Sequence, residues 1–273
     1  IISCGLWELE KVSIMNNLKN MIWIECRKAI RSRIPLWTTI GALFLPVVVA
    51  LMIIISKNPE ISRKLGVISA KADLIGLAAT EWPGFLTLIA QMLATAGFFM
   101  FIVILSWMFG REFADGTAKD LMAVPVPRLT IILGKFIIYI GWALAMSLLI
   151  LGGSLLMGSM IDLPGGSTDV LQKGIILKLV TTVLVILCVV PFALLASAGR
   201  GYLLPMSMAI LTMIVANVAL VFGWGDLFPW SIPGLYSQGT GMVGTTGIWV
   251  VIITGFIGWF STDLWWKRAD QNR

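Results

Sequence analysis

Six long apolar runs, separated by shorter polar segments, set the pattern of this chain. Each run is continuous rather than alternating, which favours helices over the strands of a membrane β-barrel. A helix needs about 20 apolar residues to cross a bilayer, and each run is long enough. The pattern therefore predicts an all-α membrane protein with six transmembrane helices, at residues 34–56, 84–110, 129–158, 175–199, 203–225 and 247–266.

A charge-dense polar connection lies between the second and third runs, at residues 109–135. Thr117 followed three residues later by Asp120 is a variant of the capping box that begins helices. Pro125 ends such a helix because it has no amide hydrogen to donate. The sequence therefore predicts a short helix at residues 117–124.

This short helix has an apolar face that includes Leu121 and Met122, whereas Lys119 and Asp120 lie off that face. About two helical turns do not persist alone in water. At a membrane surface, a short helix of this kind is expected to dock onto another protein.

The N-terminal segment before the first run predicts one more helix. Residues 1–14 carry no clear pattern, and the first recognisable element begins at Met15. Residues 16–33 have an apolar stripe with basic residues elsewhere, which is typical of an amphipathic helix in the membrane interface. The alternative for residues 16–33 is a simple flank of the first span. We treat residues 1–273 as a single transmembrane domain.

Two of the external connections also carry structural signals. Residues 57–82 begin with Asn58-Pro59-Glu60 and continue with an apolar stripe, which predicts an amphipathic helix that covers or gates the outer face. Residues 224–247 combine aromatic residues, prolines and glycines, and aromatic residues favour the membrane interface. We therefore expect short, broken helices there, before the last span.

Composition and charge agree with a membrane protein and give it an orientation. The chain is 58% hydrophobic and 12% charged, against about 25% charged for soluble domains. Most basic residues fall on the side that holds both termini and residues 109–135, and the positive-inside rule makes that side cytoplasmic. The net charge of +6 is explained by anionic membrane lipid and calls for no nucleic-acid partner. The expected location is the cell membrane.

A few polar residues lie within the predicted spans. Gln91, Thr95 and Asn217 either line a translocation path or hold helices together by hydrogen bonds. Lys135 and Lys178 lie near the ends of their spans and are expected to extend to the nearer interface. Pro191 is expected to kink the fourth span.

Several chemistries are missing from the sequence. It contains no histidine, and its three cysteines are far apart, so no metal-ligand spacing or catalytic triad can be assembled. It has no phosphate-binding Gly-x-x-x-x-Gly-Lys-Ser/Thr motif. No span has a central Asp or Glu, the usual mark of an ion relay. We therefore expect neither an enzyme nor a chain with a bound cofactor.

The polar connection resembles the loop between the second and third spans of type 2 ABC exporter permeases, most closely the bacitracin and antibiotic-export branch. The likeness extends to the amphipathic N-terminal helix, the six spans and the broken segment before the sixth. Pro127 departs from the pattern, because a small polar residue is commoner there. The residues that carry the likeness are Arg111, Glu112, Gly116, Thr117, Leu121, Pro125, Arg128, Gly134 and Lys135.

This resemblance implies a function and partners. Two permease subunits, identical or paralogous, would pair around a path and export a lipophilic or amphipathic substrate, with a peptide antibiotic or other drug as a candidate. Two separate ATPase subunits would bind ATP and Mg and dock on the helix at residues 117–124. The coupling residues would be Glu112, Gly116, Thr117, Leu121, Met122, Pro125 and Arg128.

Three alternatives remain open at this point. The chain is an ion-coupled carrier or channel that works alone, or a membrane immunity or scaffold protein that binds a partner without transport. Glu112 and Asp115 are also explained as ordinary solvated charges at a helix end.

Overall fold

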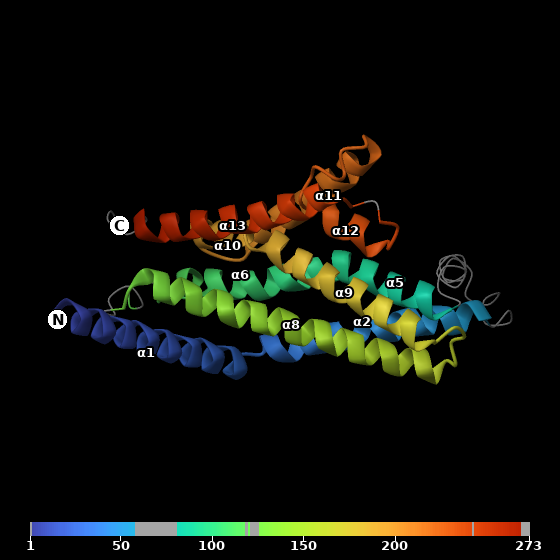
Figure 1. The fold of residues 1–273 in the computed structure, drawn as a ribbon, viewed down its shortest axis with the longest axis horizontal. Helices are drawn as coiled ribbons and strands as arrows, with labels where there is room; N and C mark the ends of the chain where they lie inside the picture. The colour runs from blue at the N-terminus through green and yellow to red at the C-terminus, as the bar shows by residue number, and fades with distance from the viewer. Residues whose placement is uncertain (1, 58–80, 118–119, 121–125, 242, 269–273) are drawn as a thin grey trace.

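The computed structural model describes residues 2–57, 81–117, 120, 126–241 and 243–268, and over these residues the chain is helical (Figure 1). The predicted external helix within residues 57–82 lies outside the described residues, except at its two ends. Most of the predicted helix at 117–124 lies outside them too, including Leu121 and Met122. The helices are α1 Ile2–Arg31, α2 Ile34–Lys57, α5 Trp82–Met92, the π-helix η1 Leu93–Gly97, α6 Phe98–Ala114, α8 Arg128–Met160, α9 Thr168–Val189, α10 Phe192–Ala198, α11 Leu203–Val221, α12 Ile232–Ser237 and α13 Thr245–Arg268.

Among the described residues, six helical segments are long and apolar enough to cross a membrane, which confirms the predicted number of spans. Two of the six are composite. The second span joins α5, η1 and α6 over Trp82–Ala114, and the fourth joins α9 and α10 over Thr168–Ala198. The short helix α12 lies in the segment for which the sequence predicts broken helices.

The fourth span breaks at Pro191, as the sequence predicts. Helix α9 ends at Val189 and α10 begins at Phe192, because Pro191 cannot continue the helical hydrogen bonds. Helix α13 closes onto this break through Gly258: a Cβ atom there would lie 2.6 Å from the Pro191 backbone nitrogen. The break thus allows a close approach of α13 to the centre of the bundle.

Two helix boundaries and one turn differ most from the sequence-based prediction. Helix α1 already begins at Ile2, although residues 1–14 show no clear pattern. Helix α9 begins at Thr168 rather than at residue 175, because the Ser167 hydroxyl accepts a hydrogen bond from the Val170 amide (3.4 Å) and caps it. The π-turn η1 inside the second span has no signal in the sequence.

Helices α1 and α2 both pack against α8. Helix α1 packs on its first part and α2 on its later part (Figure 1). The start of α1, the end of α6, the start of α8 and the end of α13 lie at one end of the bundle (Figure 1). We call this the loop end.

Candidate functional site

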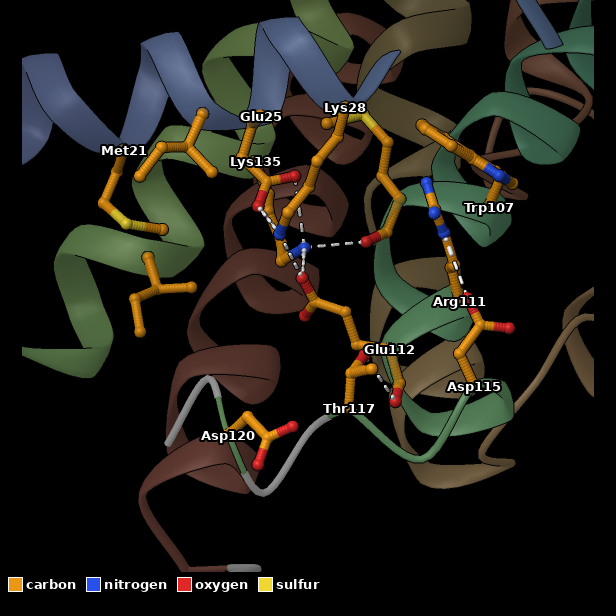
Figure 2. Close-up of a pocket in the computed structure, with 13 residues that line it drawn as sticks. Met21, Glu25, Lys28, Trp107, Arg111, Glu112, Asp115, Thr117, Asp120 and Lys135 are labelled. Carbon is orange, nitrogen blue, oxygen red and sulfur yellow. Dashed lines mark hydrogen bonds and ion pairs between the residues drawn. The ribbon is translucent and has the colours of Figure 1, made fainter. Parts of the chain in front are cut away.

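Four charged residues from three helices form a closed ring of ion pairs at the loop end (Figure 2). The Oε1 atom of Glu112, on α6, lies 2.9 Å from the Nζ atoms of both Lys28, on α1, and Lys135, on α8. Glu25, on α1, completes the ring: its Oε1 is 2.9 Å from Lys28 and its Oε2 is 3.4 Å from Lys135. We call these four residues the charge ring.

Local helix geometry places the members of the ring. Glu25 and Lys28 are three residues apart on α1, so they lie on the same face. Glu112 lies in the last turn of α6. Helix α1 comes close to α8 because Gly134 has no side chain there: a Cβ atom at Gly134 would lie 3.3 Å from the Met21 Cβ. The neighbouring Lys135 can therefore reach both carboxylates.

The ring is largely shielded from solvent. The side-chain exposures of Lys135, Glu25 and Glu112 are 1%, 4% and 8%. Lys28 is the accessible member, at 36%. Partial burial lowers its pKa, but the nearby carboxylates of Glu112 and Glu25 outweigh this effect and leave the pKa above its usual value. The Lys28 ammonium therefore stays charged at physiological pH.

Buried charges of this kind depend on one another. Taking an ion out of water costs several kcal/mol, on the order of what a well-placed counter-ion returns. Lys135 gains a further acceptor, the Met108 carbonyl oxygen at 2.9 Å. The Oε2 atom of Glu112 is buried and accepts no hydrogen bond from the described residues. One carboxylate oxygen of the ring is therefore buried without a hydrogen-bond donor among the described residues.

A cavity of about 500 Å³ lies beside the ring, and all four ring residues help to line it (Figure 2). Its lining includes Trp107, Arg111, Asp115 and Asp120. The Arg111 guanidinium lies over the Trp107 ring at 5.2 Å and pairs with Asp115 at 3.1 Å. No group of three or more His, Cys, Asp or Glu among the described residues is placed to hold a metal ion. The ion pairs of the ring join α1, α6 and α8.

Three predicted coupling residues end α6 or follow it directly. Glu112 is the centre of the ring rather than a solvated charge, so that simpler interpretation of Glu112 is wrong. Asp115 is half exposed and pairs with Arg111, as an ordinary surface charge does. Gly116 takes a positive φ of 73°, which favours glycine and ends the helix. The Thr117 hydroxyl donates back to the Glu112 carbonyl (3.4 Å).

Arg128 lies at the far end of the polar connection and contacts a different helix. Its guanidinium donates to the carbonyl oxygens of Trp266 (2.9 Å) and Lys267 (3.2 Å) at the end of α13. These carbonyls are among the last four of the helix, which have no partner within it. The predicted coupling residues Leu121, Met122 and Pro125 lie outside the described residues.

Both lysines that were expected to extend to an interface point into the bundle instead, so that prediction is wrong. Lys135 is drawn inward by the carboxylates of the ring. Lys178 is fully buried and donates to the carbonyl and hydroxyl oxygens of Ser147 on α8, the hydroxyl at 2.6 Å. The Ser147 hydroxyl also lies 2.7 Å from that of Thr182, so α8 and α9 share a buried polar contact.

The residues proposed for a translocation path make local hydrogen bonds. The Thr95 hydroxyl, in η1, donates to the Gln91 carbonyl (3.1 Å). The Asn217 amide donates to the Met213 carbonyl (2.8 Å), and its side chain is exposed on α11. Within the described part of the chain no hydrogen bond links Gln91 to Asn217.

The sequence gives little indication of the other half of the ring. Glu25 and Lys28 were not among the predicted site residues. The available signal is that Glu25 is the one acidic residue between Lys11 and Lys57, in an otherwise basic segment. A lone carboxylate there, one turn before Lys28, marks a position with a specific partner.

Comparison with known proteins gives two matches. Residues 21–217 match the model of the ABC-2 family transporter proteins, and this range contains the whole charge ring. The chain is 29% identical over 141 residues to the bacitracin transport permease protein BCRB of Bacillus licheniformis. That match covers 50% of this chain and 66% of the relative, just under two thirds of the relative's length. No solved structure matches the chain significantly.

Proposed function

The chain belongs to the ABC-2 family as a membrane-spanning permease subunit, and we propose that it serves an ATP-driven exporter whose ATPase is a separate protein. In this proposal two permease copies, or this chain and a paralogue, form the membrane part. Two ATPase subunits bind ATP and Mg and dock at the loop end. Both termini are then cytoplasmic, and α1 lies at the inner membrane interface.

The proposal is supported mainly by the contacts that residues near the two ends of the polar connection make with other helices. At its start, Glu112 binds Lys28 of α1 and Lys135 of α8. At its end, Arg128 binds the last carbonyls of α13. A push on residues 117–124 therefore reaches three other helices through buried or charge-assisted contacts. The contacts of Glu112 should transmit displacement, because separating the partners would leave a buried charge unpaired.

The substrate proposal rests on the apolar side chains that the spans expose and on the similarity to the bacitracin transport permease. The described spans expose mainly apolar side chains, and no buried acidic residue lies at their middle. A lipophilic or amphipathic molecule suits such a surface. The relative's name specifies bacitracin transport, so a peptide antibiotic is the first substrate to test.

The test is coexpression of the full chain with a candidate ABC ATPase subunit from the same genome, followed by purification of the complex. Leu121→Glu places a charge on the apolar face of the predicted docking helix and should remove the ATPase from the complex. Lys119→Glu changes charge off that face and should leave the complex intact. Retained assembly and substrate-stimulated ATP hydrolysis in Leu121→Glu would show that docking occurs elsewhere.

Two other outcomes would replace the proposal. Ion-dependent flux into liposomes that contain this chain alone would indicate a stand-alone carrier or channel. Protection of cells against an antibiotic that persists with a catalytically dead ATPase would indicate an immunity or scaffold protein. Substrate movement that needs both chains and ATP hydrolysis supports the exporter.

A further inference from the structure

A narrow apolar groove runs along α2, away from the charge ring. It lies between α2 and the η1–α6 part of the second span and has a volume of about 310 Å³. Its α2 wall begins at Ile34 and includes Gly41, and its other wall includes Ala96, Met100 and Val103. Both walls belong to candidate membrane spans, so a groove between them opens toward lipid unless protein covers it.

The chemistry of the groove suits a hydrocarbon chain. Among the described residues that line it, Thr38 supplies the hydroxyl, and this group is already used: it donates to the Ile34 carbonyl (2.9 Å) and accepts from the Trp142 indole (3.3 Å). Apart from the indole N–H of the exposed Trp37, the side chains that line the groove are therefore apolar or already hydrogen-bonded. An acyl chain gains contact with apolar surface there and loses no hydrogen bond.

Two exposed arginines stand in the chain next to the Ile34 end of the groove. Arg33 immediately precedes Ile34, and Arg31 ends α1; both side chains are exposed. Ser32 fixes the turn between them, since its hydroxyl donates to the Ala29 carbonyl (2.8 Å) and accepts from the Ile34 amide (3.3 Å). Trp37 is 64% exposed in the groove lining, as tryptophans at membrane interfaces commonly are.

We propose that this groove is a binding site for an anionic glycerophospholipid. Its phosphate lies between Arg31 and Arg33, and one acyl chain lies along α2 past Gly41. A second copy of the chain is a poorer occupant. In a dimer with its axis along the membrane normal, the arginines of both copies would meet at the same depth, and like charges would oppose the contact.

Gly41 gives a sharp test, because it is exposed and a Cβ atom there would meet nothing within 4 Å. Gly41→Leu should fill the groove without disturbing the fold. Gly152→Leu is a matched control: Gly152 is also exposed, also has open space, and lies on α8 outside the groove. The double variant Arg31→Gln/Arg33→Gln tests the two arginines.

The measurement is binding of fluorescent phosphatidylglycerol and phosphatidylcholine to the full chain in detergent, with native mass spectrometry to count retained lipids. The wild type and Gly152→Leu should prefer phosphatidylglycerol. Gly41→Leu should weaken binding of both lipids, and the arginine double variant should weaken phosphatidylglycerol alone by about tenfold or more.

The proposal fails if the wild type binds both lipids equally, or if Gly41→Leu binds lipid as Gly152→Leu does. It also fails if Gly41→Leu changes the oligomeric state and leaves lipid binding unchanged, because the groove would then seat a second copy. None of these outcomes depends on the ATPase, so they are distinct from a failure of the exporter proposal.

Discussion

The Nζ atom of Lys135 lies 2.9 Å from the Oε1 atom of Glu112, although the two residues are 23 positions apart. Most of the polar connection lies between them in the chain. Their ion pair therefore closes a loop at its base and joins the end of α6 to the start of α8. Lys28 shares the same carboxylate oxygen, so α1 is tied to the same point.

The first prediction concerns stability. Glu112→Ala leaves the buried Lys135 ammonium without its nearest carboxylate, which should lower the free energy of unfolding by about 3–5 kcal/mol. Thermal unfolding of the purified chain in detergent measures the loss. Asp169→Ala is the matched control, because it breaks an exposed pair with Lys173 and should change little. Equal losses in the two variants would contradict a special role for the ring.

The second prediction separates docking from coupling. Glu112→Gln keeps the shape of the side chain but removes its charge, which loosens the link between the connection and α1. Copurification with the ATPase should persist, while substrate transport per ATP hydrolysed should fall by about tenfold or more, within the usual range of coupling energies. Asp115→Asn, in the same turn but exposed, should retain transport. Normal transport by Glu112→Gln would remove the ring from the coupling path.

The third prediction concerns the contact between α8 and α13. Arg128→Ala removes charge-assisted hydrogen bonds to the last carbonyls of α13 and should cost about 1–3 kcal/mol. Amide hydrogen exchange should accelerate over residues 262–268, where the helix end loses its cap. Arg268→Gln, an exposed change at the same helix end, should leave exchange unaltered. Unchanged protection in Arg128→Ala would show that the cap is dispensable.

The fourth prediction concerns the buried lysine of the fourth span. Lys178 forms no ion pair within the described residues, so its burial is only partly offset by hydrogen bonds to Ser147. Lys178→Met keeps a similar volume and should raise the melting temperature. Ser147→Val removes the acceptor hydroxyl and should lower it. A Lys178→Met variant that unfolds more readily than the wild type would mean that the buried amine is stabilising.

Hydropathy was sufficient to predict the spans, because crossing a bilayer requires a long apolar helix whatever its neighbours are. Pro191 was equally informative, since a missing amide hydrogen breaks a helix locally. The inward orientation of Lys135 and Lys178 differs from the prediction, because the sequence of one span does not show which polar groups the neighbouring helices bring close to it. Within the bundle, Lys135 meets carboxylates on other helices, and Lys178 meets the Ser147 hydroxyl on α8. Such partners depend on tertiary packing.

Only part of the candidate site can be predicted from the sequence, because its other residues come close only through tertiary packing. Glu112, Gly116, Thr117 and Arg128 belong to one contiguous polar stretch, which stands out between two apolar runs. Lys28 is 84 positions from Glu112, and Glu25 is 110 from Lys135. No local pattern encodes which distant charge a helix end will meet. Arg128 and the Trp266 carbonyl that it binds are 138 positions apart, so the sequence does not predict this contact either.

The π-turn at Leu93–Gly97 has a consequence for how this chain tolerates insertions and deletions. A π-turn completes one helical turn with one more residue than an α-turn, so it can lose a residue and become an α-turn. Deleting one residue within 93–97 should therefore leave α6 close to its present rotation relative to α5. Deleting one residue from the regular part of α6, between residues 98 and 111, would instead turn the end of that helix by about 100°. Glu112 would then face away from Lys28 and Lys135, so the second span should tolerate a deletion at its π-turn and not beyond it.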